Sequence, residues 1–301
     1  MNIIQLSQLT ETEARKYMES IIWNNGRVCP HCASKKSYEL KGKSTRDGLY
    51  ECADCKQQFT VKIKTIMEGS HIKFRQWALA FHLLCSSKKG FSALQLQREL
   101  GLGSYRTALF MFHRIRLAMK AQPVAGLLEG KVECDETYVG GKPRNPNKDN
   151  KRGRGTKKIP VFAMVERNGK AISYPVTNVS GKELKGAIKE NVNSTSTIIT
   201  DEWKSYIGIG RDFEGGHKFV NHGRKEYVCG DINTNTVESF FALLKRGVIG
   251  TYHSVSKNHL LKYCDEFSFR WNHRHITDGE RTIAAIYGSQ GKRLIYKKKI
   301  I

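Results

Sequence analysis

The chain has 301 residues, of which 51 are lysine or arginine and 28 are aspartate or glutamate, so its formal net charge is +23. Hydrophobic residues make up 39% of it, which excludes a disordered basic protein and predicts two domains, or one sizeable domain with smaller appendages. The positive charge predicts a polyanionic partner, and nucleic acid fits better than a membrane, since no apolar run reaches the ~18 residues of a membrane span.

Residues 1–22 are predicted to form a short amphipathic helix, for which Thr10, followed by Glu11 and Glu13, is a candidate start. This end lacks a basic segment followed by an apolar one, so we expect no secretory signal. We expect a cytoplasmic protein. Cysteines in that reducing compartment are expected to be free thiols or metal ligands. Four scattered ones are predicted to be small buried hydrophobic residues: Cys85, Cys134, Cys229 and Cys264.

A zinc ribbon is predicted at residues 23–66 from two CxxC pairs. The pairs are Cys29 with Cys32 and Cys52 with Cys55, and the 19 residues between them match a four-cysteine zinc site. Tetrahedral Zn²⁺ requires four thiolates on tight turns, and CxxC lets two sulfurs converge on one ion. Aromatic and β-branched residues flank the pairs, which favours short strands around a structural Zn²⁺.

Residues 67–122 are predicted to form a helix-turn-helix-like DNA-binding region. Apolar residues recur at helical spacing from Trp77 to Leu84, and a Gly-containing turn separates two further helical segments. The last segment is basic and carries three candidate DNA contacts, Arg106, Arg114 and Arg116. An ordinary helical hairpin is the alternative, which the basic segment and the adjacent ribbon disfavour.

Residues 123–301 are predicted to form one catalytic domain with an RNase H-like fold, an α/β arrangement of a mixed five-stranded sheet and helices. The predicted elements are strands at 131–139, 159–166 and 170–177, a helix at 181–192, a strand at 196–201, a short helix at 203–209, a strand near 217–221, and two helices at 234–246 and 257–274. An Asn-Gly dipeptide at 168–169 predicts a hairpin between the second and third strands.

Two aspartates in this domain suit a metal site. Asp135 lies within a strand-like run, and Asp201 ends another. In an RNase H-like sheet these two strands are neighbours, so the carboxylates can share an ion, which also removes the cost of an unpaired charge near a core. Two competitors, Glu133 and Glu136, are set aside on strand parity. An exposed aspartate at a strand end is the alternative for either position alone.

Spacing alone admits three residues as a third carboxylate, namely Glu226, Asp231 and Glu238. Helical periodicity favours Glu238, which lies at the border of an apolar stripe expected to pack on the sheet. The stripe consists of Val237, Phe240, Phe241 and Leu244. Lys245 lies two turns further along the same side, where it can meet a phosphate; a solvated Glu–Lys pair is the alternative. Three such carboxylates suit two Mg²⁺ ions about 3.5–4 Å apart for phosphoryl chemistry.

Further candidate DNA contacts lie in the loop at 142–158, which is basic and contains two glycines. This composition predicts a mobile phosphate-binding loop, with a solvated loop as the alternative. The candidates are Lys151, Arg152, Arg154, Lys157 and Lys158. His253, which follows Gly250, is a candidate contact to the DNA end, with a structural turn as the alternative.

Over nearly its whole length the chain resembles the zinc-ribbon-bearing bacterial insertion-sequence transposases of the DDE class, with an ISXO2-like transposase domain. The motifs that carry the resemblance are CPHC, CADC, VECDETYVGG, ITDEWKSY and the long segment beginning NTNTVESFF. The resemblance implies that Asp135, Asp201 and Glu238 are the catalytic metal-binding triad and that Lys245 contacts phosphate. Asn235, one turn before Glu238, remains the alternative third residue. The implied ions are Mg²⁺ (or Mn²⁺) at the catalytic site and a structural Zn²⁺.

We therefore expect a DNA transposase that binds terminal inverted repeats and catalyses metal-dependent strand cleavage and strand transfer into target DNA. Synapsis of two DNA ends implies a homodimer or a higher oligomer. Two alternatives stay open: an RNase H-like nuclease without strand transfer, and a zinc-ribbon, helix-turn-helix regulator with a degenerate catalytic domain. The intact acidic residues argue against the regulator.

Overall fold

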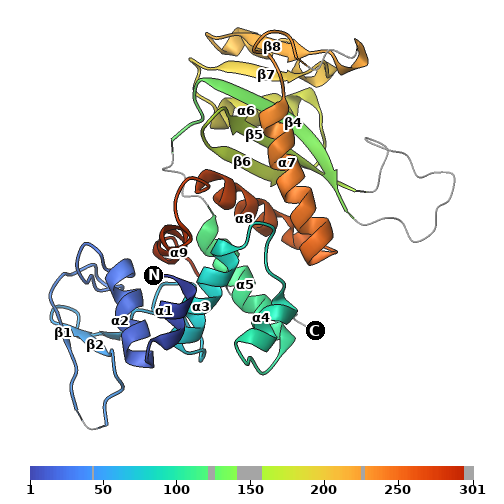
Figure 1. The fold of residues 1–301 in the computed structure, drawn as a ribbon. Coiled ribbons are helices and arrows are strands. Elements are labelled where there is room, and N and C mark those ends of the chain that lie inside the picture. The colour runs from blue at the N-terminus through green and yellow to red at the C-terminus, as the bar shows by residue number, and fades with distance from the viewer. Residues whose placement is uncertain (43, 121–125, 141–157, 225–227, 295–301) are drawn as a thin grey trace, which may run out of the picture. The chain divides into compact units, whose positions relative to one another are not determined.

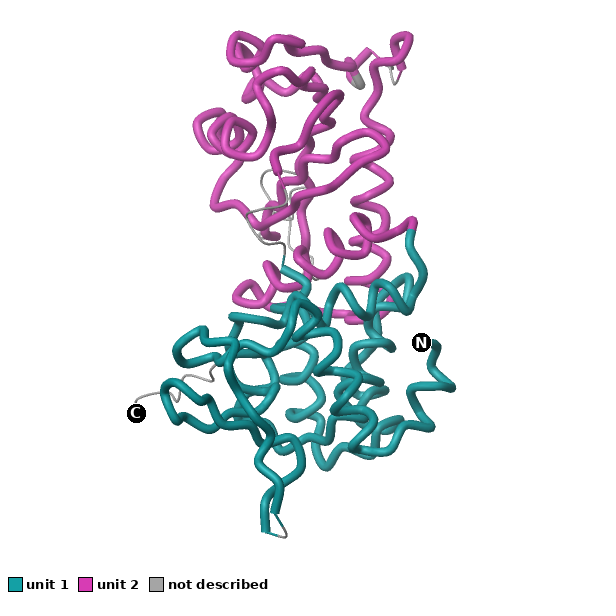
Figure 2. Tube along the Cα trace, turned by 90° about the vertical axis from the view of Figure 1, so that its left-hand side faces the viewer, with its two compact units in different colours: residues 1–120, 276–301 teal, residues 121–275 magenta. Residues whose placement is uncertain are grey.

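The computed structural model describes the chain except residues 43, 121–125, 141–157, 225–227 and 295–301. It divides into two compact units, shown in Figure 2. Unit 1 comprises residues 1–120 and 276–301, and unit 2 comprises residues 121–275. Among the described residues, no helix has the length and apolar character needed to cross a membrane.

Unit 1 begins with two helices, α1 (Ile3–Gln8) and α2 (Glu11–Ile22), in place of the one helix expected there. Thr10 starts α2, as predicted. Its side chain accepts a hydrogen bond from the backbone N–H of Glu13, whose carboxylate in turn accepts one from the Thr10 N–H at 2.8 Å. This capping box satisfies two of the backbone donors that a helix start leaves without partners.

The ribbon contains a three-stranded antiparallel sheet made of β1 (Ser37–Glu39), β2 (Tyr50–Cys52) and β3 (Gln58–Phe59). Its small core consists of Cys29, Tyr50, Cys52 and Phe59. The Trp23 ring packs edge-on against Tyr50, with centroids 5.3 Å apart. Such a core is too small to stabilise a fold without a cross-link, so we expect a metal ion bound by the cysteines to supply much of the stability of the ribbon.

The rest of unit 1 is helical, with α3 (Phe74–Ser86), α4 (Ala93–Glu99), α5 (Tyr105–Met119) and α9 (Asp278–Tyr287). α9 is not predicted from the sequence, and the predicted catalytic domain, residues 123–301, includes its residues. In the structure α9 packs on α3, and His82 Nδ1 lies 3.2 Å from Thr282 Oγ1. Three α9 residues are fully or almost fully buried: Thr282, Ala285 and Ile286. Removing α9 would expose the face of α3 that it covers.

Unit 2 is built on a five-stranded sheet with strand order β6-β5-β4-β7-β8. The strands are β4 (Lys131–Val139), β5 (Ile159–Glu166), β6 (Ala171–Pro175), β7 (Thr197–Asp201) and β8 (His217–Val220). β4, β5 and β6 pair antiparallel, whereas β7 pairs parallel with β4 and β8 parallel with β7. Asn168 turns the β5–β6 hairpin with φ 59°. The predicted mixed, RNase H-like sheet is confirmed. The short helix predicted at 203–209 is instead two 3₁₀ turns, Lys204–Tyr206 and Ile209–Asp212.

Helices cover both faces of this sheet. α6 (Gly181–Asn191) packs on the face that carries Val132 and Cys134, and α7 (Asn235–Gly247) and α8 (Leu260–Asn272) pack on the other (Figure 1). β5 contributes to both cores because alternate residues point to opposite faces, with Phe162 on the α6 side and Ala163 on the α7 side. Residues of β4 on the same face as Val139 therefore point toward α7.

Candidate functional site

Asp135 and Asp201 lie on neighbouring strands and on the same face of the sheet. The parallel β4–β7 pairing ends with Glu133 aligned with Ile199, and Asp135 and Asp201 each lie two residues beyond that pair on their strands. Laterally paired residues point to the same side of a sheet, and neighbouring strands lie about 4.7–4.9 Å apart. The two carboxylates therefore share one corner of the sheet, on the face covered by α7.

Strand parity removes Glu136 from competition, but the same argument was wrong for Glu133. Glu136 lies on the opposite face, where the Tyr206 hydroxyl donates to its carboxylate at 2.8 Å. Glu133 is two residues from Asp135 and so points to the same face. It is fully buried and contacts the start of α7. This role of Glu133 was not predicted, although the period of two along a strand places Glu133 on the same face as Asp135.

α7 presents Glu238 and Lys245 on its exposed side. The predicted apolar stripe is confirmed, since Val237, Phe240 and Leu244 are fully buried in the core beneath the helix. Glu238 lies in the first turn, and its Oε1 accepts a hydrogen bond from Thr234 Oγ1 at 2.9 Å. The Lys245 ammonium, in the last turn, lies 6.0 Å from the Phe241 ring centroid.

The electrostatics of Asp135 connect it with the other candidate acids. Burial, followed by the negative charges of Glu136, Asp201 and Glu238, raises the pKa of Asp135 to about 8. A carboxyl group surrounded by like charges titrates late unless a cation balances them. Asn235 is neutral and contributes nothing of this kind. The arrangement therefore has the donor chemistry that Mg²⁺ and Mn²⁺ prefer, and it demands positive charge.

The carboxylates do not form a closed cage. Across the described residues, the four ribbon cysteines are the group whose ligand atoms all lie within 4.8 Å of one another. An open set of acids is suited to an ion that also binds substrate oxygens, because Mg²⁺ commonly takes only one or two carboxylates in addition to phosphate and water.

The ribbon cysteines have the geometry of a closed zinc site. All four are free thiols, with Sγ–Sγ distances of 3.7 Å for Cys29–Cys55 and 3.5 Å for Cys32–Cys52. A tetrahedron with Zn–S bonds of about 2.3 Å puts sulfurs about 3.8 Å apart. The cluster therefore fits Zn²⁺ with little adjustment.

Two matching turns hold these thiols. The residue after each CxxC has positive φ, 63° at Ala33 and 57° at Lys56, and donates its N–H to the carbonyl of the first cysteine at 2.9 and 3.0 Å. The N–H groups of Cys55 and Asp54 lower the pKa of the Cys52 thiol to about 6. Because zinc binds the thiolate, these backbone donors prepare the site for the ion.

The three arginines of α5 that are predicted to contact DNA differ in how exposed their side chains are. Arg106 is exposed in the first turn of the helix, as a DNA-reading residue must be. Arg114 is half-buried over the Phe110 ring, and burial lowers its pKa. Arg116 is 1% exposed within the core of unit 1, so it cannot reach a phosphate in this conformation. Helical periodicity failed here because a long basic side chain can occupy an apolar face.

The remaining predicted DNA contacts lie partly outside the described residues. These are Lys151, Arg152, Arg154 and Lys157. Lys158 is exposed at the edge of β5, and His253 is exposed at φ 58°, where its Nδ1 lies 3.1 Å from the Ile249 carbonyl oxygen. One of the four cysteines predicted to be buried, Cys229, is exposed, whereas the other three are buried.

Comparison with known proteins gives matches to both parts of the chain. Residues 127–272 match the ISXO2-like transposase domain, and residues 9–58 match the transposase zinc-ribbon domain. An uncharacterized protein in transposable element ISH50 of Halobacterium salinarum is 30% identical over 274 residues, which are 87% of this chain and 91% of that protein. A chain in a cryo-EM structure of the simian T-cell lymphotropic virus intasome in complex with PP2A regulatory subunit B56 gamma is 14% identical. The match has a TM-score of 0.30 and covers 60% of this chain and 65% of that one.

Proposed function

Because the chain belongs to the insertion-sequence transposases with an ISXO2-like transposase domain and a transposase zinc ribbon, we propose that it binds its element's terminal inverted repeats and catalyses DNA cleavage and strand transfer. One observation supports the catalytic part most: Asp135 lies on β4 and Asp201 ends the neighbouring parallel strand β7, on the face of the sheet that α7 covers, and Glu238 lies in the first turn of α7. The net charge of +23 supports a DNA substrate.

In this proposal Asp135, Asp201 and Glu238 hold Mg²⁺ or Mn²⁺. When bound, two such ions lower the pKa of an attacking water or 3′-hydroxyl and stabilise the departing oxygen. Lys245 stands two turns beyond Glu238 and contacts a phosphate of the bound strand. Neither cleavage nor transfer then needs a covalent enzyme intermediate.

Strand transfer is the reaction that tests this function. Protein incubated with Mg²⁺, a duplex carrying the terminal repeat of its own element, and a target plasmid should release 3′-hydroxyl ends and join them to the plasmid. Cleavage without joining would support a nuclease. Repeat binding without cleavage in Mg²⁺ or Mn²⁺ would support a DNA-binding regulator and contradict the proposal.

Joining two element ends requires that two DNA ends be held together. We propose that at least two copies of the chain assemble on them, on chromosomal DNA in the nucleoid. Cross-linking of the repeat complex should then yield a dimer or a higher oligomer, whereas a catalytically complete monomeric complex would contradict this part.

The basic loop should dominate the salt dependence of DNA binding. Replacing Lys151, Arg152 and Arg154 together by glutamine should weaken binding to all sequences. If each residue neutralises one phosphate, the slope of log K against log salt should flatten by about 2.7, at about 0.9 per phosphate. Fluorescence anisotropy titrations over a salt series measure this slope, and an unchanged slope would mean that the loop does not touch DNA.

Arg106→Ala serves as the contrast to the loop variant. Arg106 is exposed at the start of α5, where helix-turn-helix proteins contact base edges. We expect this variant to lose preference for the terminal repeat over random DNA by about 1–3 kcal/mol, with a slope change of at most about 0.9. Equal losses of affinity for the terminal repeat and for random DNA would show that Arg106 contacts only the DNA backbone.

A further inference from the structure

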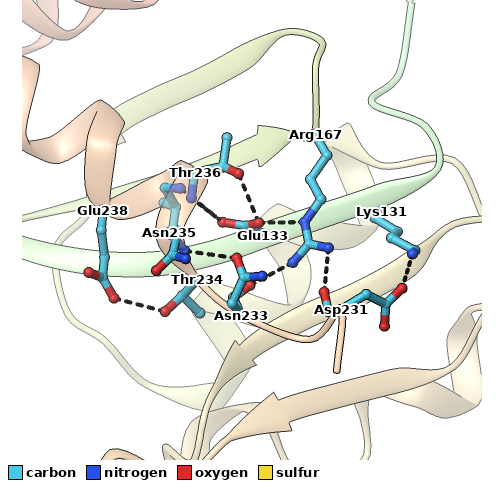
Figure 3. A network of polar contacts seen from close by, with 10 residues as sticks. Lys131, Glu133, Arg167, Asp231, Asn233, Thr234, Asn235, Thr236 and Glu238 are labelled. Atoms are coloured by element: carbon cyan, nitrogen blue, oxygen red, sulfur yellow. Dashed lines mark hydrogen bonds and ion pairs between the residues drawn. The ribbon is translucent and has the colours of Figure 1, made fainter. Parts of the chain in front are cut away.

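Glu133 makes an unusually complete set of contacts at the start of α7 (Figure 3). Its side chain is fully buried on β4. One oxygen accepts from the Thr236 N–H at 2.8 Å and the Val237 N–H at 3.0 Å, and the other accepts from Thr236 Oγ1 at 2.9 Å and Arg167 Nε at 2.6 Å. A buried carboxylate is costly unless such partners satisfy it, and here four donors do.

Arg167, at the end of β5, extends the same contact to the segment that leads into α7. Its Nη1 donates to the Asp231 carbonyl at 2.5 Å and its Nη2 to the Asn233 carbonyl at 2.9 Å. A guanidinium fixes its donors in one plane, so the two bonds to this segment and the third to Glu133 hold the segment against β4. Lys131 of β4 also forms an ion pair with the Asp231 side chain.

The local sequence of α7 does not supply these contacts. The N-cap residue, Thr234, makes no capping hydrogen bond; its hydroxyl donates to Glu238 instead. An N-cap side chain ordinarily accepts from the second or third N–H of its helix, here Thr236 and Val237. Glu133, more than a hundred residues earlier in the chain, takes that role and adds a negative charge at the positive end of the helix.

We propose that Glu133 and Arg167 are positioning residues for the catalytic carboxylates, an inference that rests on the proposed function. Glu133 lies two residues from Asp135 on β4, and the backbone groups that it binds lie one and two residues before Glu238 on α7. The contact joins the strand that carries the first acid to the helix that carries the third. It therefore sets the separation of Asp135 and Glu238 and, through it, the affinity for the metal ion.

A second buried ion pair in unit 2 offers a matched control. The side chains of Glu266 and Arg270 are 0% and 6% exposed, and their shortest N–O distance is 2.6 Å, as in the Glu133–Arg167 pair. This pair lies within α8, and the Tyr252 hydroxyl also donates to Glu266 at 2.6 Å. Loss of either glutamate charge should destabilise unit 2, since it leaves a buried or partly buried arginine unbalanced. Only the loss at Glu133 should also shift Asp135 relative to Glu238.

Measuring the Mn²⁺ affinity of the full-length protein without DNA distinguishes an effect on the position of the metal ligands from a general loss of stability. Calorimetric titration should show that Glu133→Gln weakens Mn²⁺ binding by about 10–100-fold, the usual effect of removing a group that orients metal ligands. Glu266→Gln should bind Mn²⁺ like the unmodified protein, even where its melting temperature falls as far. Hydrogen exchange should accelerate in the first turn of α7 in Glu133→Gln and stay unchanged there in Glu266→Gln.

Wild-type Mn²⁺ affinity in Glu133→Gln, or an equal loss in Glu266→Gln, would overturn the inference. If Glu133→Gln does not fold, Arg167→Gln decides. It leaves Glu133 with its three α7 donors and should weaken Mn²⁺ binding about 10-fold, whereas unchanged affinity would overturn the inference. Asp135→Asn tests the proposed function separately, because retention of Mn²⁺ by that variant would reject the metal site itself.

Discussion

Replacing Asp135, Asp201 or Glu238 by its amide is expected to abolish cleavage and strand transfer while leaving binding to the terminal repeat nearly intact. The amide keeps the shape of the side chain but removes the charge that balances a divalent ion. Loss of one charge-stabilising group at an active site costs about 10²–10³ in rate, and loss of a metal ligand should cost at least as much. Gel assays of cleaved and joined products measure the effect.

Combining these substitutions should add little to any one of them, because the three residues act as one unit. Asn235→Ala is the informative partner variant. Asn235 and Glu238 are both exposed in the first turn of α7, but only a charged group can raise the pKa of Asp135 as Glu238 does. An active Glu238→Gln protein together with an inactive Asn235→Ala protein would show that the third metal ligand is Asn235 and not Glu238.

Cys52→Ser is expected to release zinc and unfold the ribbon. Cys52 is fully buried in a core of four residues, two of which are cysteines of the cluster. Structural zinc sites supply about 10–16 kcal/mol of binding free energy that is also folding free energy. We expect metal analysis to fall from one zinc per chain to near zero, and protease cleavage to appear within residues 23–66.

Cys229→Ser provides the control for the zinc experiment. Cys229 is an exposed thiol in unit 2 and does not belong to the four-cysteine group. This variant should retain one zinc per chain and an intact ribbon. Full zinc content in Cys52→Ser would defeat the assignment of that residue as a ligand.

Periodic features of the sequence predicted much of this structure. The apolar stripe of α7 follows from one local rule and occupies the face expected of it, whereas the parity prediction along β4 held for Glu136 and failed for Glu133. The CxxC spacing predicted the cysteine cluster because each tight turn brings two sulfurs together and a tetrahedral zinc ion needs four. The prediction that the strands of Asp135 and Asp201 are neighbours came from the fold class, which the order of predicted strands and helices indicated.

The missed features depend on contacts between distant parts of the chain. Nothing near Thr234 indicates that the cap of α7 is Glu133, more than a hundred residues earlier. Arg116 has the position of a DNA contact in a basic segment, and only the packing of unit 1 buries it. α9 begins with a capping box of Thr277 and Glu280, a local signal that was visible, but its packing on α3 was not.

The discontinuity of unit 1 has a consequence for synthesis on the ribosome. The chain leaves this unit after residue 120 and returns at 276, so 121–275 must be translated before α9 exists. At about 5–20 residues per second that interval is roughly 8–30 s. Throughout it, the face of α3 on which α9 packs, with His82 against Thr282, is not covered by that helix. A nascent chain therefore completes the unit that contains its zinc ribbon only after the entire sheet with its acidic residues has been made.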